Sequence, residues 1–325
     1  MSIKAERPAR VKIVRRPLHG VLLLDKPLHL SSNDALQKVK WLLRGEKAGH
    51  TGTLDPLATG VLPICFGAAT KFSHIHLDAV KTYEATLKLG QKTSTGDAEG
   101  DVIEAREVAP AMTVQALLDE ACARFTGAIS QIPPMTSALK KDGRPLYELA
   151  RQGLEVERAA RAIVIHKLVI TKLDDERLGI VVTCSKGTYI RTLGEDIGKF
   201  LGCGGHLSSL RRIATGDFEI DKAITLPELE ALSDEARGSL LLPVDVMLSQ
   251  YQRVDLDIDN AGRFLSGVRR KTELKDCECV CVYGPGDQLL GSAHIKAGEL
   301  IPTRLLSPLD IEEIQNFLRE KREEV

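Results

Sequence analysis

The 325-residue sequence lacks the features of membrane and secreted proteins. Its apolar runs, such as GVLLLD and VLPICFGAA, are much shorter than the roughly 18 residues that cross a bilayer. The basic start has no uninterrupted apolar segment, which argues against a secretory signal. Seven cysteines are too few, and odd in number, for a disulfide scaffold in a chain of this length. We therefore expect a cytoplasmic protein.

Metal-ligand patterns are also missing. Cys277, Cys279 and Cys281 alternate in DCECVCVYG, so on a strand they share one face, whereas zinc sites favour C-x-x-C pairs. Cys203 and His206 form a C-x-x-H pair without an obvious second half. We interpret both groups as structural and expect no metal site.

Charge is distributed unevenly along the chain. The apolar content of 43% and the charged content of 27% are ordinary for a soluble globular protein. Residues 1–50 carry 11 Lys or Arg against 4 Asp or Glu, whereas residues 221–260 carry 9 acids against 3 bases. This asymmetry is compatible with a polyanion that binds one end of the molecule, or with a basic tail that has no partner.

Apolar periodicity predicts a mixture of strands and helices. We expect strands at residues 20–25, 81–90, 161–170 and 177–187, helices at 31–44, 113–125 and 188–202, and short β segments from about residue 251 to a charged terminal helix. Ser31 with Asp34 fits a capping box for the first helix, and Thr113 is the expected cap of the second. Residues 131–153 are partly irregular, which is typical of a functional or mobile segment.

One acid in GHTGTLDPLATGVL, residues 49–62, is a candidate for chemistry. Asp55 has no neighbouring acid and no metal-ligand spacing, so a nucleophile, a general base and a turn cap all remain open. In a partly apolar setting beside Leu54, a carboxylate needs a cation or hydrogen bonds to stay charged. Arg191 in TYIRTL is a suitable cation, although sequence alone does not bring it to Asp55.

Several motifs, in order along the chain, resemble those of the TruB-type tRNA pseudouridine synthases. They are GVLLLDKP, SSNDALQKVK, GHTGTLDPLATGVLPICFGAATKF, YEATLKLG, IPPM with SALKKDGRPLYELARQG, CSKGTYIRTLGEDIG and GCGGHLSSLRR. The resemblance runs from about residue 20 to 245 and continues more weakly to about 306, in a region similar to a PUA-like domain. It implies isomerisation of uridine at position 55 of the tRNA T loop. That reaction is redox-neutral, so it requires no cofactor and no metal.

The resemblance implies a catalytic role for three residues. Asp55 matches the family's essential aspartate, which attacks the ribose or the base, or assists glycal formation. Arg191 matches the arginine that pairs with this aspartate. Tyr83 matches the tyrosine that stacks on the target uracil and is the proposed base for the C5 proton. Without the resemblance, Tyr83 would simply be a core aromatic on a strand.

Six further residues match positions that bind or support the substrate. Tyr189 and Leu210 match pocket residues around the flipped base, and His50 matches a histidine that enters the T loop. The others are Lys26, which resembles a residue supporting the pocket, and Lys140 and Arg144, which fall in the segment that closes on RNA. Arg211 and Arg212 are ambiguous.

The resemblance also implies the architecture. We expect an α+β fold with a mixed, largely antiparallel curved central sheet, a catalytic cleft flanked by helices, and a small C-terminal PUA-like β domain. The expected boundaries are a basic tail at 1–19, a catalytic domain at 20–250 with an RNA-clamping insertion at about 131–161, and the PUA-like domain with a C-terminal helix at 251–325. The expected partner is the T arm of tRNA. We expect a monomer with no obligatory protein partner and no membrane association.

Two positions depart from the family pattern. His29 stands where the family usually has Gly, and it bears strain if that position needs a positive φ. Thr136 stands where the family commonly has Tyr, a departure expected to affect RNA closure but not Asp55, Tyr83 or Arg191. Two alternatives stay open: a guide-RNA-dependent pseudouridine synthase, and a tRNA-binding or folding protein.

Overall fold

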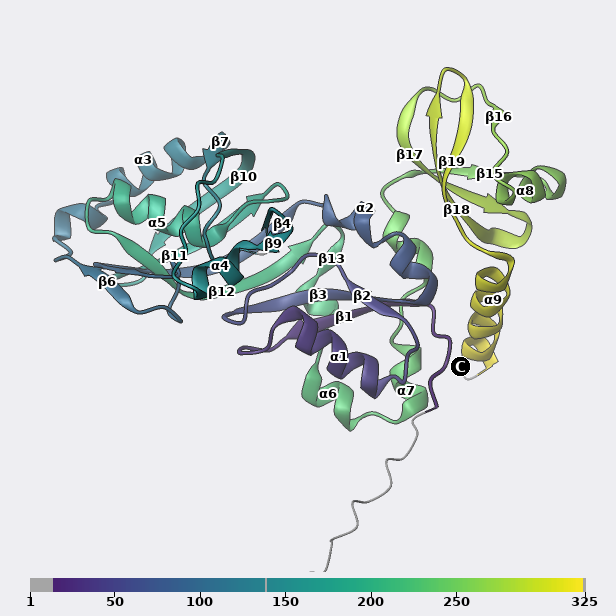
Figure 1. The fold of residues 1–325 in the computed structure, drawn as a ribbon, viewed down its shortest axis with the longest axis horizontal. Coiled ribbons are helices and arrows are strands. Elements are labelled where there is room, and N and C mark those ends of the chain that lie inside the picture. The colour runs from purple at the N-terminus through teal and green to yellow at the C-terminus, as the bar shows by residue number, and fades with distance from the viewer. Residues whose placement is uncertain (1–13, 138, 324–325) are drawn as a thin grey trace, which may run out of the picture.

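Two β-sheets organise the chain in the computed structural model, which describes residues 14–137 and 139–323 (Figure 1). Most of the predicted basic tail, residues 1–13, lies outside the described residues. Within the described residues, no helix is both long and apolar enough to cross a membrane. The same residues contain no group of three or more His, Cys, Asp or Glu side chains that could hold a metal ion.

The larger sheet has ten strands, in the order β14-β1-β3-β12-β4-β11-β10-β7, with β13 beside β12 and β2 beside β3. The pairs β1–β14 and β3–β12 are parallel, and the remaining pairs are antiparallel, so the sheet is mixed and largely antiparallel as predicted. Its strands are β1 (Gly20–Lys26), β2 (Ala48–His50), β3 (Ala58–Phe66), β4 (Lys81–Leu89), β7 (Gly127–Gln131), β10 (Arg161–Lys172), β11 (Arg177–Cys184), β12 (Gly205–Thr215), β13 (Phe218–Glu219) and β14 (Ile224–Thr225).

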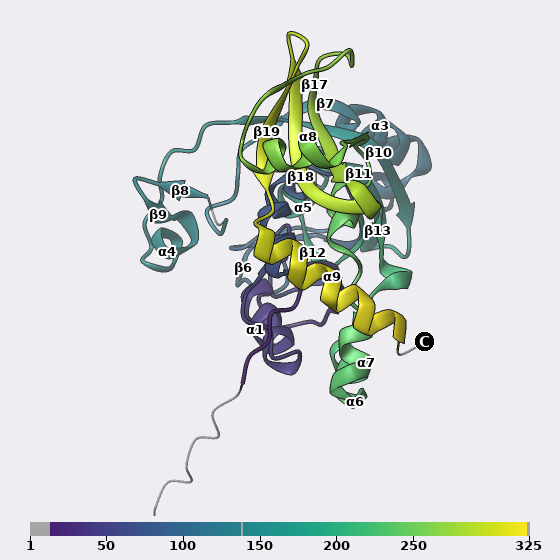
Figure 2. The same ribbon diagram turned by 90° about the vertical axis from the view of Figure 1, so that its right-hand side faces the viewer.

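Helices and short hairpins lie around the two sheets. The α-helices are α1 (Ser32–Leu42), α2 (Ser73–Leu77), α3 (Gln115–Phe125), α4 (Leu146–Arg151), α5 (Ile190–Phe200), α6 (Leu226–Ala231), α7 (Asp234–Ser239), α8 (Ile258–Leu265) and α9 (Pro308–Glu323). Two-stranded sheets join β5 (Gln91–Thr93) to β6 (Val102–Ala105) and β8 (Lys140–Lys141) to β9 (Arg144–Pro145). The hairpin β8–β9 and α4 project away from the main sheet (Figure 2).

The predicted patterns explain these elements. In β4 the alternate residues Tyr83, Ala85, Leu87 and Leu89 are buried, and α3 and α5 pack on the sheet beside them (Figure 1). Strand β1 is buried on both faces, because successive residues of GVLLLD face two different hydrophobic clusters. A strand covered on both sides reads as a continuous apolar run.

Helix starts were predicted with mixed success. The Ser31 side chain accepts a hydrogen bond from the Asp34 N–H at 3.1 Å, which confirms the predicted cap of α1. The predicted cap at Thr113 is wrong, because α3 begins at Gln115 with Val114 at the N-cap position. The Thr113 hydroxyl instead donates to the carbonyl of Pro110 at 3.4 Å, within a preceding 3₁₀ turn.

The smaller sheet fits the predicted PUA-like description. Its order is β15-β17-β18-β19-β16, from β15 (Gln252–Asp255), β16 (Arg270–Lys271), β17 (Cys277–Gly284), β18 (Gln288–Lys296) and β19 (Glu299–Leu305). Helix α9 follows this sheet and extends back toward the part of the chain that forms the larger sheet (Figure 2). Two contacts fasten it there: Lys71 pairs with Asp310 at 2.7 Å, and His19 with Glu313 at 2.8 Å.

His29 lies in a strained turn directly after β1. Its φ is +67°, so this position does adopt the left-handed conformation that favours glycine. Its backbone N–H donates to the carbonyl of Pro56 at 2.9 Å, which ties the turn to the loop that carries Asp55. The strain is therefore stored beside the candidate catalytic loop.

Replacing His29 by glycine is expected to stabilise the protein. A left-handed backbone conformation costs an L-residue roughly 1–2 kcal/mol, which glycine avoids. Glycine also makes the unfolded chain more flexible, which offsets part of this effect. The free energy of unfolding should therefore increase by about 0.5–1 kcal/mol. Urea denaturation measures it. His29→Ala is the matched control, because it keeps the Cβ and with it the strain. A glycine variant no more stable than the alanine variant would show that this turn holds no strain.

Candidate active site

The loop between β2 and β3 holds Asp55 in a fixed position. Ser32, at the start of α1, accepts a hydrogen bond from the Leu54 N–H at 2.7 Å and donates its hydroxyl to the Leu54 carbonyl at 2.9 Å. The Asp55 carbonyl accepts from the Ala58 N–H at 3.0 Å, which closes a turn around Pro56. These bonds use the backbone of the loop, so the carboxylate of Asp55 is left for other partners.

That carboxylate meets Arg191, which extends from the first turn of α5. One guanidinium nitrogen lies 2.8 Å from the Asp55 carboxylate, and the Arg191 side chain is only 7% exposed. The guanidinium also donates to the Thr95 carbonyl at 3.1 Å and lies 3.5 Å from the carboxylate of Asp97. Two acids from different loops therefore share one cation.

Opposing effects set the charge of Asp55. Burial raises the pKa of its carboxyl, and the nearby negative charge of Asp97 raises it further. The positive charges of Arg191 and Lys26 act in the other direction, and the pKa nevertheless stays above its ordinary value. The Asp55 side chain is 38% exposed, so an incoming group can reach it. The acid is thus accessible, and it depends on its cationic neighbours to stay ionised.

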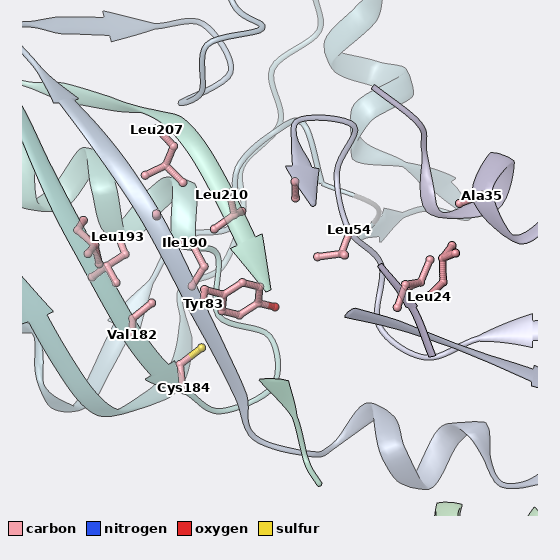
Figure 3. Close-up of a cluster of buried hydrophobic side chains, with 14 of the residues drawn as sticks. Leu24, Ala35, Leu54, Tyr83, Val182, Cys184, Ile190, Leu193, Leu207 and Leu210 are labelled. Atoms are coloured by element: carbon pink, nitrogen blue, oxygen red, sulfur yellow. The ribbon is translucent and has the colours of Figure 1, made fainter. Parts of the chain in front are cut away.

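Tyr83 lies across the same space from Asp55. It is 9% exposed on β4, and its hydroxyl points from the strand toward the segment that carries Leu54 (Figure 3). Burial raises the pKa of the phenol. Its cross-strand partner on β12 is Arg212, whose positive charge lowers the pKa of the phenol against the effect of burial.

A cavity of about 370 Å³ joins these groups. Its lining includes five residues that the sequence resemblance singled out: Asp55, Tyr83, Tyr189, Arg191 and Leu210. They come from a loop, two strands and the start of one helix, so only the tertiary fold brings them together. The volume lies within the range of small-molecule pockets, and the lining combines apolar walls with a few polar groups.

Two other singled-out residues, Lys26 and His50, lie outside the lining of the cavity. Lys26 is fully buried at the end of β1, where its ammonium donates to the carbonyls of Pro27 at 2.8 Å and Leu30 at 2.6 Å. Burial lowers its pKa to about 8. His50 ends β2, and its buried Nδ1 has no hydrogen-bond partner among the described residues. Burial lowers the pKa of His50, and so does the nearby Arg212 charge, so the ring is neutral at pH 7.

Lys140 and Arg144 are not part of the cavity. Both are exposed on the projecting β8–β9 hairpin (Figure 2). The Arg144 guanidinium donates to the Gln152 side chain at 3.2 Å. Their place in the fold suits contact with a large partner and not with the contents of the cavity.

Two supporting residues, Asp97 and Gln131, escaped the sequence analysis, and a third, Arg212, was left ambiguous. Asp97 is buried beside Arg191, with its carboxylate accepting from the Thr95 hydroxyl at 2.5 Å. Gln131, at the end of β7, donates to the Tyr189 carbonyl and accepts from the Tyr189 N–H, which fixes the start of α5. Arg212 could have been found, because strand alternation puts it on the same face as Leu210. No comparable pattern marks Asp97 or Gln131.

The expectation that Thr136 leaves the central residues untouched is wrong. The Thr136 hydroxyl accepts a hydrogen bond from Arg191 at 2.6 Å, and its carbonyl accepts a second one at 3.4 Å. The physical reason is that the segment after β7 folds back over the guanidinium. A short hydroxyl side chain then reaches the cation that Asp55 also contacts.

A carboxylate held by a guanidinium, beside an aromatic ring in a cavity of this size, defines an enzyme site for covalent or acid–base chemistry on a small ring-bearing group. The family described as TruB family pseudouridylate synthase, N-terminal domain, matches residues 40–190. The family described as tRNA pseudouridylate synthase B C-terminal domain matches residues 191–249. The chain belongs to the TruB family of pseudouridylate synthases and is an isomerase, as its motifs predicted.

Similar proteins span nearly the whole chain. The tRNA pseudouridine synthase B of Verminephrobacter eiseniae is 57% identical, with 94% of each chain covered. The protein of the same name from Cupriavidus metallidurans is 54% identical over 93% of this chain and 98% of its own. The crystal structure of a Cbf5-Nop10-Gar1 complex matches with a TM-score of 0.69 and 24% identity, covering 90% of this chain and 86% of that one. At that identity the likeness shows the fold alone, and it agrees with the predicted α+β architecture.

Proposed function

We propose that the protein isomerises uridine to pseudouridine in tRNA, at position 55 of the T loop. The observation that carries this proposal is the Asp55 carboxylate, 2.8 Å from Arg191 and lining one cavity with Tyr83. The 57% identity to a tRNA pseudouridine synthase B supports tRNA as the substrate.

The chemistry suits this set of groups. The N1–C1′ bond of uridine breaks, the uracil turns, a C5–C1′ bond forms, and the proton lost from C5 is balanced by one gained at N1. No electrons are gained or lost overall. Asp55 attacks as a nucleophile or stabilises positive charge on the sugar, and Arg191 keeps it ionised. Tyr83 stacks on the uracil and accepts the C5 proton.

The cavity requires the target base to leave the RNA stack. Extrusion costs a few kcal/mol, and stacking on an aromatic ring recovers roughly 1–3 kcal/mol. Tyr189 and Leu210 line the same cavity and would enclose the flipped base. We expect His50, at the end of β2, to enter the T loop; its Nδ1 is buried and has no hydrogen-bond partner among the described residues.

The wider surface supports a role in gripping RNA. We propose that residues 131–161 clamp the T arm, with Lys140 and Arg144 on its phosphates. The proposed catalytic unit is 20–250, followed by the PUA-like unit at 251–325. The enzyme would act in the cytoplasm as a monomer, without an obligatory protein partner.

Pseudouridine mapping on a T-arm transcript tests the proposal. The pure protein alone is expected to form pseudouridine at position 55, and a transcript with cytidine at that position is the control. Product formation that requires an added guide RNA would favour a guide-dependent synthase. Binding of the transcript without product would favour a tRNA-binding or folding protein.

Thr136→Val is expected to slow the reaction about tenfold, because a donor of the Arg191 guanidinium loses its partner. The substitution keeps the shape of the side chain and removes the hydroxyl. The single-turnover rate constant on a T-arm transcript measures the effect. Thr136→Ser keeps the hydroxyl and should react at close to the wild-type rate. A rate close to wild type in Thr136→Val with a loss in Thr136→Ser would mean that the methyl group, and not the hydrogen bond, is what counts.

A further inference from the structure

Arg212 is a cation in an unexpected place. It is 1% exposed in the middle of the main sheet, on β12. Among the described residues, no carboxylate lies within ion-pair distance of its guanidinium. A buried charge without a counter-charge is costly, and an apolar side chain would fill the same space at less cost. The residue therefore needs a function beyond filling the sheet.

The hydrogen bonds of Arg212 reach both ends of the Asp55 segment. Its Nε donates to the Val61 carbonyl at 2.8 Å, and its Nη2 donates to the Gly52 carbonyl at 3.1 Å. Gly52 has φ +75°, and a Cβ there would lie 3.1 Å from the guanidinium. One side chain thus holds the strand after Asp55 and the turn before it.

The same guanidinium faces the phenol oxygen of Tyr83. The two residues are direct cross-strand partners in the β12–β4 register, and both line the same cavity. A guanidinium carries donors only and a phenolate oxygen accepts, so the two groups are chemically matched. The positive charge of Arg212 lowers the pKa of the Tyr83 phenol, against burial, which raises it, and so makes the phenolate, the form able to take up a proton, easier to form.

The other charged or titratable groups around Tyr83 do not duplicate this role. Cys184 on β11 is neutral at pH 7, because burial raises its pKa to about 11. Asp55 disfavours a phenolate by its own negative charge. The Lys81 ammonium is already bonded to the carbonyls of Leu77 and Ala79, both at 2.6 Å.

We propose that Arg212 is a positioning residue that prepares the Tyr83 hydroxyl to accept the C5 proton and locks the Asp55 loop opposite it. This inference rests on the proposed function. After C1′ has bonded to C5, the C5–H bond breaks and its electron pair returns to the uracil ring. The Tyr83 phenol first gives up its own proton, which balances the one gained at N1, and the resulting phenolate, whose charge Arg212 balances, takes the proton from C5.

A hydrogen isotope effect tests this role. T-arm transcripts carrying uridine with hydrogen or deuterium at C5 are compared in single-turnover reactions. Arg212→Met is expected to react about 10- to 100-fold more slowly than wild type, with a larger isotope effect because C5 deprotonation has become limiting. Arg212→Lys keeps the charge and should restore part of the rate and reduce the isotope effect.

Arg211→Met is the matched control. Arg211 precedes Arg212 on β12 but pairs with Asp25 at 2.6 Å. The isotope effect of the Arg211→Met variant should therefore equal that of wild type. Slower reaction of the Arg212 variants with an unchanged isotope effect would overturn the inference and leave a purely structural role. If Arg212→Met does not fold, the rate and the isotope effect of Arg212→Lys are compared with wild type in the same way. A wild-type enzyme that forms no pseudouridine would instead overturn the proposed function.

Discussion

Asp55→Asn is expected to abolish pseudouridine formation while tRNA binding is retained. Asparagine keeps the shape of the side chain but cannot attack as a carboxylate or balance positive charge on the sugar. Loss of a nucleophile of this kind lowers the rate on the order of 10⁴-fold or more. Arg191 keeps its contacts to Thr95, Thr136 and Asp97, so the site is expected to stay assembled. Pseudouridine mapping and transcript binding, measured on the same preparation, separate the two properties.

The same substitution is expected to leave the fold at least as stable as wild type near neutral pH. Burial raises the pKa of Asp55 in the folded state. A carboxyl with a raised pKa contributes stability at pH values below its unfolded pKa and loses it as the pH rises through the folded pKa. At neutral pH the ionised acid is therefore held at a cost that asparagine does not carry, and at acid pH the difference should vanish. Retained product, or a melting temperature well below wild type, would contradict the assignment.

Local patterns predicted much of the fold for physical reasons. The period-two alternation around Tyr83 and the continuous apolar run of GVLLLD both report burial, and burial fixes strand register. The cap at Ser31 is equally local, because its hydroxyl bonds a neighbour three residues along. At Thr113 the hydroxyl bonds the Pro110 carbonyl within a 3₁₀ turn, so the prediction of a helix cap there was wrong.

Local sequence patterns predicted less of the site, because its contacts join segments that are far apart in the sequence. Nothing near Asp55 in the sequence indicates that Arg191 lies 2.8 Å away, and only the motif resemblance suggested the pair. The contact from Thr136 depends on how the segment after β7 returns over the cavity. Strand alternation puts Arg212 on the face of Leu210, but a strand arginine usually faces water, so its burial becomes clear only in the assembled sheet.

Arg191→Met is expected to lower the rate on the order of 10³-fold and to make the remaining activity depend on pH. Without the guanidinium, Asp55 and Asp97 face each other with no cation between them. The pKa of Asp55, already raised, then rises further, because its largest opposing influence is gone. More of the enzyme carries a protonated, inactive Asp55 at neutral pH, so the rate should climb as the pH increases through that raised value. Single-turnover rates across a pH series measure this climb.

Two further variants separate charge from folding in this prediction. Arg191→Lys retains a cation without the several donors of the guanidinium, and it should be faster than Arg191→Met with a weaker dependence on pH. Asp97→Asn, combined with Arg191→Met, removes the second acid, which lowers the pKa of Asp55 and should recover part of the rate at neutral pH. A loss of activity that is independent of pH in all three variants would mean that Arg191 acts on the substrate directly, and not by keeping Asp55 ionised.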